Sequence, residues 1–280
     1  MSIAAEQARQ AEAFRARHHA GSPLLLCNAW DGMSARIFAA AGFEAIATSS
    51  GGVAWSLGYP DGEVAPWTMI VGATERIVQA ARLPVTADLE EGYADSADRL
   101  ALSVCEIIAT GIVGINLEDG THHGPGAIRD AEEAAQRIRA ACKAARSVGV
   151  PIVINARIDV WQRQIGAESG RFDEAVRRAR LYREAGADCL FPIGLRDFDT
   201  IARFVKAVDM PVNVVAKAGM PPLAEFARIG VARVSTASAP ALAIMAKARE
   251  LAADLKASQA FDTLASPLTH AEAQRLFALP

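Results

Sequence analysis

Short apolar runs alternate with longer segments of helical periodicity along almost the whole chain. The runs are rich in Val, Ile, Leu and Ala, and in the segments between them apolar residues recur every three or four positions. We expect eight strands, at residues 23–28, 45–48, 85–88, 113–118, 151–155, 189–192, 212–215 and 232–235. The helices that follow them are expected at residues 34–41, 66–81, 96–110, 130–148, 172–185, 197–207, 222–229 and 239–257.

This alternation predicts the fold class. Strands that are apolar on both faces and separated by helices indicate a parallel sheet. Eight strand–helix units in about 250 residues match a closed (β/α)8 barrel of the TIM type. An open doubly wound sheet usually carries a glycine-rich dinucleotide fingerprint after its first strand, and residues 28–35 carry none. We interpret residues 1–280 as a single barrel domain with an N-terminal helix and a C-terminal helical tail.

Composition narrows the functional classes. The chain has 280 residues with 29 Lys+Arg and 32 Asp+Glu, a formal charge of −3, so it has no basic field for nucleic acid. No apolar run reaches the ~18 residues that span a bilayer, so we expect no membrane partner. The four cysteines are not spaced as a zinc site or a redox pair, and the charged start lacks a signal peptide. We therefore expect a cytoplasmic location.

Acidic residues gather where the predicted strands end. Catalytic groups of parallel barrels lie at the carboxyl ends of the strands. Asp88 and Glu90 stand at the end of the third strand, Glu118 ends the fourth and Arg157 follows the fifth. Oxygen ligands without His or Cys suit Mg²⁺, with Mn²⁺ possible, and the arginine fork suits a carboxylate or phosphonate.

Other polar residues lie beside this expected site. The turn at residues 49–52 offers backbone N–H groups for an anion. Glu91 and Asp119 also follow the third and fourth strands, and we interpret them as helix caps or solvated charges.

The sequence around these residues resembles the isocitrate lyase/phosphoenolpyruvate mutase superfamily. The matching stretches are residues 28–63, 83–96, 111–120 and 150–159, with weaker similarity at 210–219 and 232–238. The resemblance implies a (β/α)8 barrel whose eighth helix is swapped between subunits of a homo-oligomer, a tetramer or a dimer. It also implies a small 2-oxo or 2-hydroxy carboxylate as substrate. A C–C or P–C bond would be cleaved or formed beside a metal-stabilised enolate.

The resemblance implies roles for individual residues. Mg²⁺ would be held by Asp88, Glu90 and Glu118, directly or through water. Backbone amides at Ser49, Ser50 and Gly51 would contact the substrate, Arg157 would hold its acid group, and Asn213 would supply a polar contact. Asp61 matches an acidic residue near the family's active site.

One loop departs from the family pattern. Isocitrate and methylisocitrate lyases carry a Lys-(Lys/Arg)-Cys-Gly motif after the fourth strand, whereas residues 118–126 here contain no Cys and no Lys. The Lys and Asn of the mutase loop are also absent. His122 and His123 are the only groups in this loop that titrate near neutrality, which suggests one of them as a general acid or base.

Three hypotheses follow from the sequence. The first is a Mg²⁺-dependent lyase that cleaves a C–C bond in a small 2-oxo or 2-hydroxy carboxylate. The second is P–C chemistry of the phosphoenolpyruvate mutase or phosphonopyruvate hydrolase type, which the same metal site would serve. The third is a non-catalytic binder of 2-oxo acids, distinguished by tight binding without turnover.

Overall fold

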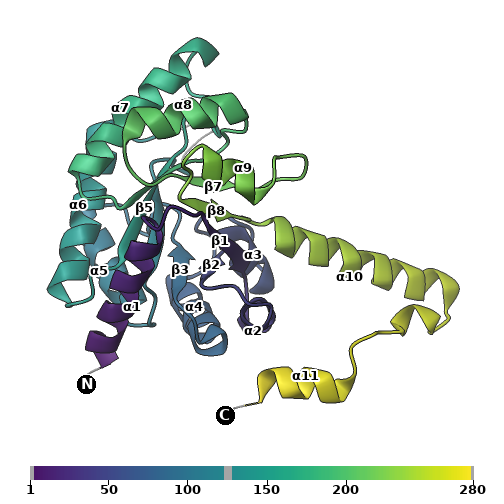
Figure 1. Cartoon of the computed structure of the whole chain (residues 1–280). Helices are drawn as coiled ribbons and strands as arrows, with labels where there is room; N and C mark the ends of the chain where they lie inside the picture. The colour runs from purple at the N-terminus through teal and green to yellow at the C-terminus, as the bar shows by residue number, and fades with distance from the viewer. Residues whose placement is uncertain (1–2, 123–127, 279–280) are drawn as a thin grey trace.

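Eight parallel strands form a nearly closed barrel in the computed structural model, which describes residues 3–122 and 128–278 (Figure 1). Neighbouring strands follow the order β6-β5-β4-β3-β2-β1-β8-β7, and an isolated parallel bridge from Leu190 to Val212 joins the two edges. The (β/α)8 prediction is confirmed. The strands are β1 (Leu24–Ala29), β2 (Ile46–Thr48), β3 (Val85–Asp88), β4 (Gly114–Glu118), β5 (Val153–Ile158), β6 (Cys189–Pro192), β7 (Asn213–Val215) and β8 (Arg233–Ser235).

Amphipathic helices cover the outside of the barrel and bury one apolar face each. Ile77, Leu100 and Ile138 are examples from three successive helices, and each is at most 3% exposed. Side-chain caps begin several of these helices, as when Asp197 accepts from the Thr200 amide at 2.8 Å. The helices around the barrel are α2 (Gly32–Ala40), α4 (Trp67–Ala81), α5 (Ala97–Ile108), α6 (Ala131–Ser147), α7 (Arg171–Glu184), α8 (Phe198–Val208), α9 (Leu223–Arg228) and α10 (Ala239–Ser258).

Two differences from the predicted elements affect the functional end of the barrel. The fifth strand extends to Ile158, so Arg157 lies inside it instead of following it, because the pairing with β4 continues to the register Glu118↔Arg157. A short helix, α3 (Ser50–Ser56), occupies the segment expected to be a turn, with Ser49 as its N-cap. Two 3₁₀ turns, Glu168–Gly170 and Asp262–Leu264, complete the regular structure before the last helix.

The helix α1 (Ile3–Arg17) covers the end of the barrel at which the strands begin. Phe14 is 2% exposed and packs with Leu24, Leu26 and Val113 in a separate apolar cluster. A Cβ on Gly114 would lie 3.2 Å from the Phe14 ring, so this glycine lets the ring approach the barrel wall. Burying a phenylalanine contributes about 1.5–3 kcal/mol. This cluster fills the end of the barrel at which the strands begin, and the cavity described below opens at the opposite end.

His18 is a buried titratable group at the packed end. Its Nδ1 lies 2.9 Å from the Phe14 carbonyl oxygen. Burial, together with the Arg233 charge, lowers the His18 pKa to about 3. The unfolded histidine gains a proton below about pH 6.5 and the folded one does not. Stability from this group is therefore complete above that pH and falls as the pH drops towards 3, by up to about 1.4 kcal/mol per pH unit.

We expect His18→Asn to flatten this pH dependence, because an asparagine amide still donates to the Phe14 carbonyl but takes up no proton. The measurement is the free energy of unfolding in urea between about pH 7 and pH 5. His19→Asn is the matched control, since His19 is exposed and its variant should keep the wild-type slope. Parallel curves for the wild type and His18→Asn would contradict the expectation.

The C-terminal segment leaves the barrel. Figure 1 shows α10 running outward and the chain then returning, so that α11 (His270–Phe277) lies near α2. The Arg36 side chain donates to the Leu276 carbonyl at 2.6 Å and fixes this return. Along α10, Ile244 and Met245 are half exposed. Within the described ranges, no helix combines the length and the apolar character needed to cross a bilayer.

Candidate active site

A cavity of about 440 Å³ opens at the end of the barrel where the strands finish. Parallel strands bring their carboxyl ends to one mouth, and the loops that follow them form the walls. Part of the wall is apolar, with Trp55, Phe191 and Leu195 among its residues. The polar residues that line the cavity include Asn28, Ser49, Ser50, Asp61, Asp88, Asn116, Arg157, Ser235 and Thr236. A cavity of this size and mixed lining suits a small polar molecule.

Asp88 and Asp61 present carboxyl groups to this cavity. Asp88 ends β3, and its Oδ1 is buried without a hydrogen-bond partner among the described residues. Burial and the neighbouring Glu90 raise the pKa of Asp88, while Arg157 lowers it. Burial, Glu90 and Asp88 raise the pKa of Asp61 to about 6. Both carboxyl groups are therefore in surroundings that favour taking up a proton or a cation.

Gly51 allows Asp61 to come this close. A Cβ at position 51 would lie 3.0 Å from Asp61 Oδ2, so a larger residue would push the carboxyl group away. Gly51 lies in the first turn of α3, whose N-cap Ser49 accepts a hydrogen bond from the Gly52 amide at 3.1 Å. The predicted anion-binding turn is therefore a helix start. The Ser49 amide, expected to contact the substrate, already donates to the Ala29 carbonyl at 3.1 Å, and the Gly52 amide is used by the cap.

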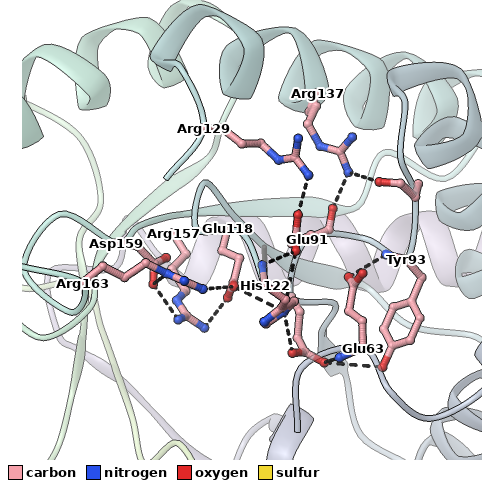
Figure 2. Close-up of polar contacts among 12 residues, drawn as sticks. Glu63, Glu91, Tyr93, Glu118, His122, Arg129, Arg137, Arg157, Asp159 and Arg163 are labelled. Carbon is pink, nitrogen blue, oxygen red and sulfur yellow. Dashed lines mark hydrogen bonds and ion pairs between the residues drawn. The ribbon is translucent and has the colours of Figure 1, made fainter. Parts of the chain in front are cut away.

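Arg157 connects the cavity to two buried carboxylates. Figure 2 shows its guanidinium beside Glu118 and Asp159. It forms an ion pair with Glu118, and its Nη2 lies 2.7 Å from Asp159 Oδ1. Burial alone would lower the pKa of Arg157, but Asp159 and Glu118 raise it above its usual range. Burial raises the pKa of Glu118 well above its ordinary value, and Arg157 opposes this. The arginine is thus held rigidly and stays charged.

His122, suggested from the sequence as a general acid or base, lies against Glu90. Its Nε2 lies 3.0 Å from Glu90 Oε2 and 3.9 Å from Glu118 Oε1. The hydrogen bond to Glu90 raises the His122 pKa, against the effect of burial. The imidazole does not line the cavity and instead brings positive charge to Glu90. His123, the other histidine considered for acid–base chemistry, lies outside the described residues.

Glu91 and Asp119 are not the solvated charges that we expected from the sequence. They are 4% and 1% exposed. Glu91 accepts the His122 amide at 2.7 Å and pairs with Arg129. Asp119 accepts from Tyr182 at 2.6 Å and from Arg178 at 3.0 Å, and it also receives the Asp159 amide at 2.8 Å. The interpretation was wrong because arginines on α6, on α7 and in the loop before α6 contact these two residues. The positions of the strands along the sequence give no sign of these contacts.

Asn213 is not among the residues that line the cavity. It lies at the start of β7, is fully buried, and donates to Ser235 Oγ at 3.3 Å inside the barrel. The carboxyl end of β7 is Val215, which does line the cavity, and the substrate contact of Asn213 stays a prediction.

The sequence analysis missed several polar residues inside the barrel. Asn28 and Asn116 line the cavity, and Asn155 and Arg233 lie behind it. A signal was available, because side chains alternate between the two faces of a strand. Asn116 shares a face with Glu118, and Asn155 shares one with Arg157. A polar residue at every second position of an otherwise apolar strand therefore marks the barrel interior.

The carboxylates fit a divalent cation only in part. Among the residues that the structure describes, no three His, Cys, Asp or Glu side chains converge closely enough to hold an ion. Glu90 is paired with His122 and Glu118 with Arg157. Asp88 alone of the three predicted ligands lines the cavity, and its Oδ1 is buried without a hydrogen-bond partner among the described residues. Mg²⁺ usually keeps several waters and binds one or two carboxylates plus substrate oxygens. The donor set fits Mg²⁺ on these terms: Asp88, which lines the cavity, would hold the ion directly, whereas Glu90 and Glu118, which do not line it, would act only through water.

Comparison with known proteins shows consistent similarity. A family model for phosphoenolpyruvate phosphomutase matches residues 14–256. The 2-methylisocitrate lyase of Escherichia coli (strain K12) is 32% identical over 246 residues, covering 85% of this chain and 80% of the relative. A lyase or mutase candidate from Burkholderia cenocepacia J2315 superposes with a TM-score of 0.90 at 36% identity, covering 98% of both chains. A phosphonopyruvate hydrolase solved with oxalate and Mg²⁺ gives a TM-score of 0.84 at 25% identity, covering 95% of this chain and 94% of that one.

These matches agree with the barrel and with the polar cavity at its carboxyl end. The family model alone extends over most of the chain, and the relatives are aligned over most of their own length. The chain belongs to the isocitrate lyase/phosphoenolpyruvate mutase superfamily of enzymes.

Proposed function

We propose that the protein is a Mg²⁺-dependent lyase that cleaves a C–C bond in a small 2-oxo or 2-hydroxy carboxylate. The observation that carries this proposal is one cavity lined by both a rigid guanidinium, Arg157, and an unpartnered carboxylate oxygen, that of Asp88. A guanidinium binds an acid group, and a free carboxylate binds a hard cation. Together they suit a substrate that carries a carboxylate beside a second oxygen.

Such a reaction requires two things of the protein: stabilisation of the negative charge that develops on the substrate, and transfer of a proton. Cleavage beside a carbonyl places negative charge on the carbonyl oxygen, and Mg²⁺ would supply positive charge there. Arg157 would hold the acid group of the substrate. Asp61, with a pKa of about 6, would give or accept the proton, since its carboxyl group lines the same cavity.

A substrate panel tests the proposal directly. Oxaloacetate, malate derivatives, isocitrate and methylisocitrate would each be incubated with the protein, with and without Mg²⁺, and products identified by mass spectrometry. The expected result is Mg²⁺-dependent cleavage of at least one acid. Turnover that persists at full rate in excess chelator would contradict the metal requirement, and absence of any turnover would contradict the lyase.

P–C chemistry is the second candidate, favoured by the likeness to phosphonopyruvate hydrolase over nearly the whole fold. Phosphonopyruvate carries a carboxylate and a 2-oxo group, which Arg157 and the metal would bind in the same way. Phosphorus NMR separates the candidates, because release of inorganic phosphate from phosphonopyruvate requires P–C cleavage. A C–C lyase would leave the phosphonate signal unchanged.

We also propose that the exposed face of α10 packs against a second copy of the chain. Ile244 and Met245 are 55% and 50% exposed on a helix that leaves its own barrel, and burying such residues favours association. Analytical ultracentrifugation should find a dimer or a tetramer. Ile244→Glu with Met245→Glu should shift the protein towards the monomer, whereas Lys247→Glu, at another exposed position on the same helix, should not. A monomeric wild type would contradict this proposal.

A further inference from the structure

Asn116 lies in β4 directly beside the candidate reaction centre. It is the register partner of Asp88 in β3, and its side chain lines the cavity that Arg157 also lines. Only 6% of the residue is exposed. Its Oδ1 accepts hydrogen bonds from Asn155 Nδ2 at 2.8 Å and from Arg233 Nη2 at 3.2 Å, both inside the barrel. The amide oxygen is therefore fully occupied on the side away from the cavity.

These two hydrogen bonds fix which way the amide points. A guanidinium has five donors and no acceptor, so the Asn116 atom that faces Arg233 must be the oxygen. The amide nitrogen must then face the other side, where the cavity lies. Nδ2 makes no hydrogen bond in the part of the chain that the structure describes. It presents two unused donors next to Asp88.

Arg233 has no evident stabilising role of its own. It is fully buried, and its Nε and Nη1 have no hydrogen-bond partner among the described residues. Burial lowers its pKa to about 10, which still leaves it charged at neutral pH. A buried cation without a paired carboxylate costs folding free energy, so stability does not account for it. Within the described part of the chain, its side chain makes one hydrogen bond, to Asn116.

We propose that Asn116 donates a hydrogen bond through Nδ2 to a substrate oxygen, and that Arg233 is a positioning residue that fixes the amide for this purpose. The inference rests on the proposed function of the same cavity. A preoriented neutral donor stabilises an oxygen on which negative charge develops, and it needs no reorganisation during the reaction. Asn116 thereby complements Arg157, which addresses the acid group of the substrate.

The test begins with Asn116→Asp and Asn116→Ala. Aspartate has nearly the same shape and still accepts from Arg233, but it removes the donor. Both variants should lower kcat/KM by about 10²-fold. They should also weaken binding of oxalate in the presence of Mg²⁺ by about tenfold, measured by calorimetry. Thr86→Val is the matched control, because Thr86 is a buried polar residue of the barrel that does not line the cavity.

Arg233→Met separates positioning from structure. It should lower kcat/KM by about tenfold while leaving the unfolding midpoint in urea unchanged or higher, because it removes an unpaired buried charge. In the Asn116→Ala background it should have no further effect on kcat/KM, since the two residues act through one hydrogen bond. Arg233→Lys, which keeps a donor, should restore part of the loss.

The possible failures are distinguishable. Asn116 variants that bind oxalate and turn over substrate like the wild type would overturn the inference and leave the proposed function intact. Additive losses from Arg233→Met and Asn116→Ala would overturn the positioning role. A wild type that neither binds oxalate nor cleaves any acid would overturn the proposed function and this inference with it.

Discussion

Replacing Arg157 with Met is expected to abolish activity and to destabilise the fold by about 3–5 kcal/mol. The guanidinium is the partner of two carboxylates whose side chains are 2% and 0% exposed, those of Glu118 and Asp159. Its removal leaves both as buried charges without their main cation. Urea unfolding would measure the loss of stability, and kcat/KM on the substrate found by the panel would measure the loss of activity.

The difference in the free energy of unfolding between the wild type and Arg157→Met should become smaller as the pH falls. Burial already raises the pKa of Glu118, and without Arg157 its carboxyl group is more easily protonated in the folded state. A group whose folded pKa is raised binds more protons when folded, so its protonation favours the folded state at low pH. Adding Glu118→Gln to Arg157→Met should recover part of the stability without recovering activity.

Arg163→Met is the matched control for this prediction. Arg163 faces the same two carboxylates, but at 3.8 Å from Glu118 and 3.7 Å from Asp159. Its loss should cost no more than about 1 kcal/mol, the range for weakly coupled ion pairs. If Arg163→Met and Arg157→Met lowered the free energy of unfolding equally, Arg157 would not be the main cation of these two carboxylates.

Replacing Asp88 with Asn is expected to reduce kcat by about 10³-fold without lowering stability. The loss follows from the proposed role of its free oxygen as the direct ligand of Mg²⁺. Burial and Glu90 raise the pKa of Asp88, which means that the charged carboxylate is unfavourable in the folded protein. A neutral amide removes this cost, so the midpoint of thermal unfolding without metal should stay the same or rise.

Calorimetric titration with Mg²⁺ would provide the second measurement for Asp88→Asn, and binding should weaken strongly. The control is Asp209→Asn, which changes an exposed aspartate at the opposite end of the barrel and should alter neither metal binding nor turnover. Unchanged Mg²⁺ affinity in Asp88→Asn would refute the ligand assignment. A clear loss of stability in Asp88→Asn would contradict the argument that the charged Asp88 carboxylate is unfavourable in the folded protein.

The barrel could be predicted from the sequence because the patterns that specify its strands and helices are local and occur eight times. Each strand is a short β-branched or apolar run, each helix has its own periodicity, and eight such units leave few topologies for a parallel sheet. The third strand was predicted with the same limits as the structure has. The prediction was wrong at two places. Pairing with β4 extends β5 beyond its predicted end, and Ser49 caps the helix α3, which was not predicted.

The placement of Asp88, Glu118 and Arg157 at one end of the barrel was predictable, because the position of a residue along a parallel strand decides at which end it lies. How these groups are paired was not. Glu90 with His122, Asp119 with Arg178, and Asn116 with Arg233 join residues from separate elements. Such pairs depend on side-chain reach and direction across the packed barrel, and no pattern along the chain encodes them.

The sequence by itself thus determined the eight-unit architecture, the end of the barrel at which Asp88, Glu118 and Arg157 lie, and the kinds of groups gathered there. Only the tertiary structure decided which carboxylate keeps a free oxygen, which ones are neutralised by cations, and which way the Asn116 amide faces. The physical reason is that strand and helix periodicity is set by neighbours along the chain, whereas burial, pKa and hydrogen-bond direction are set by neighbours in space.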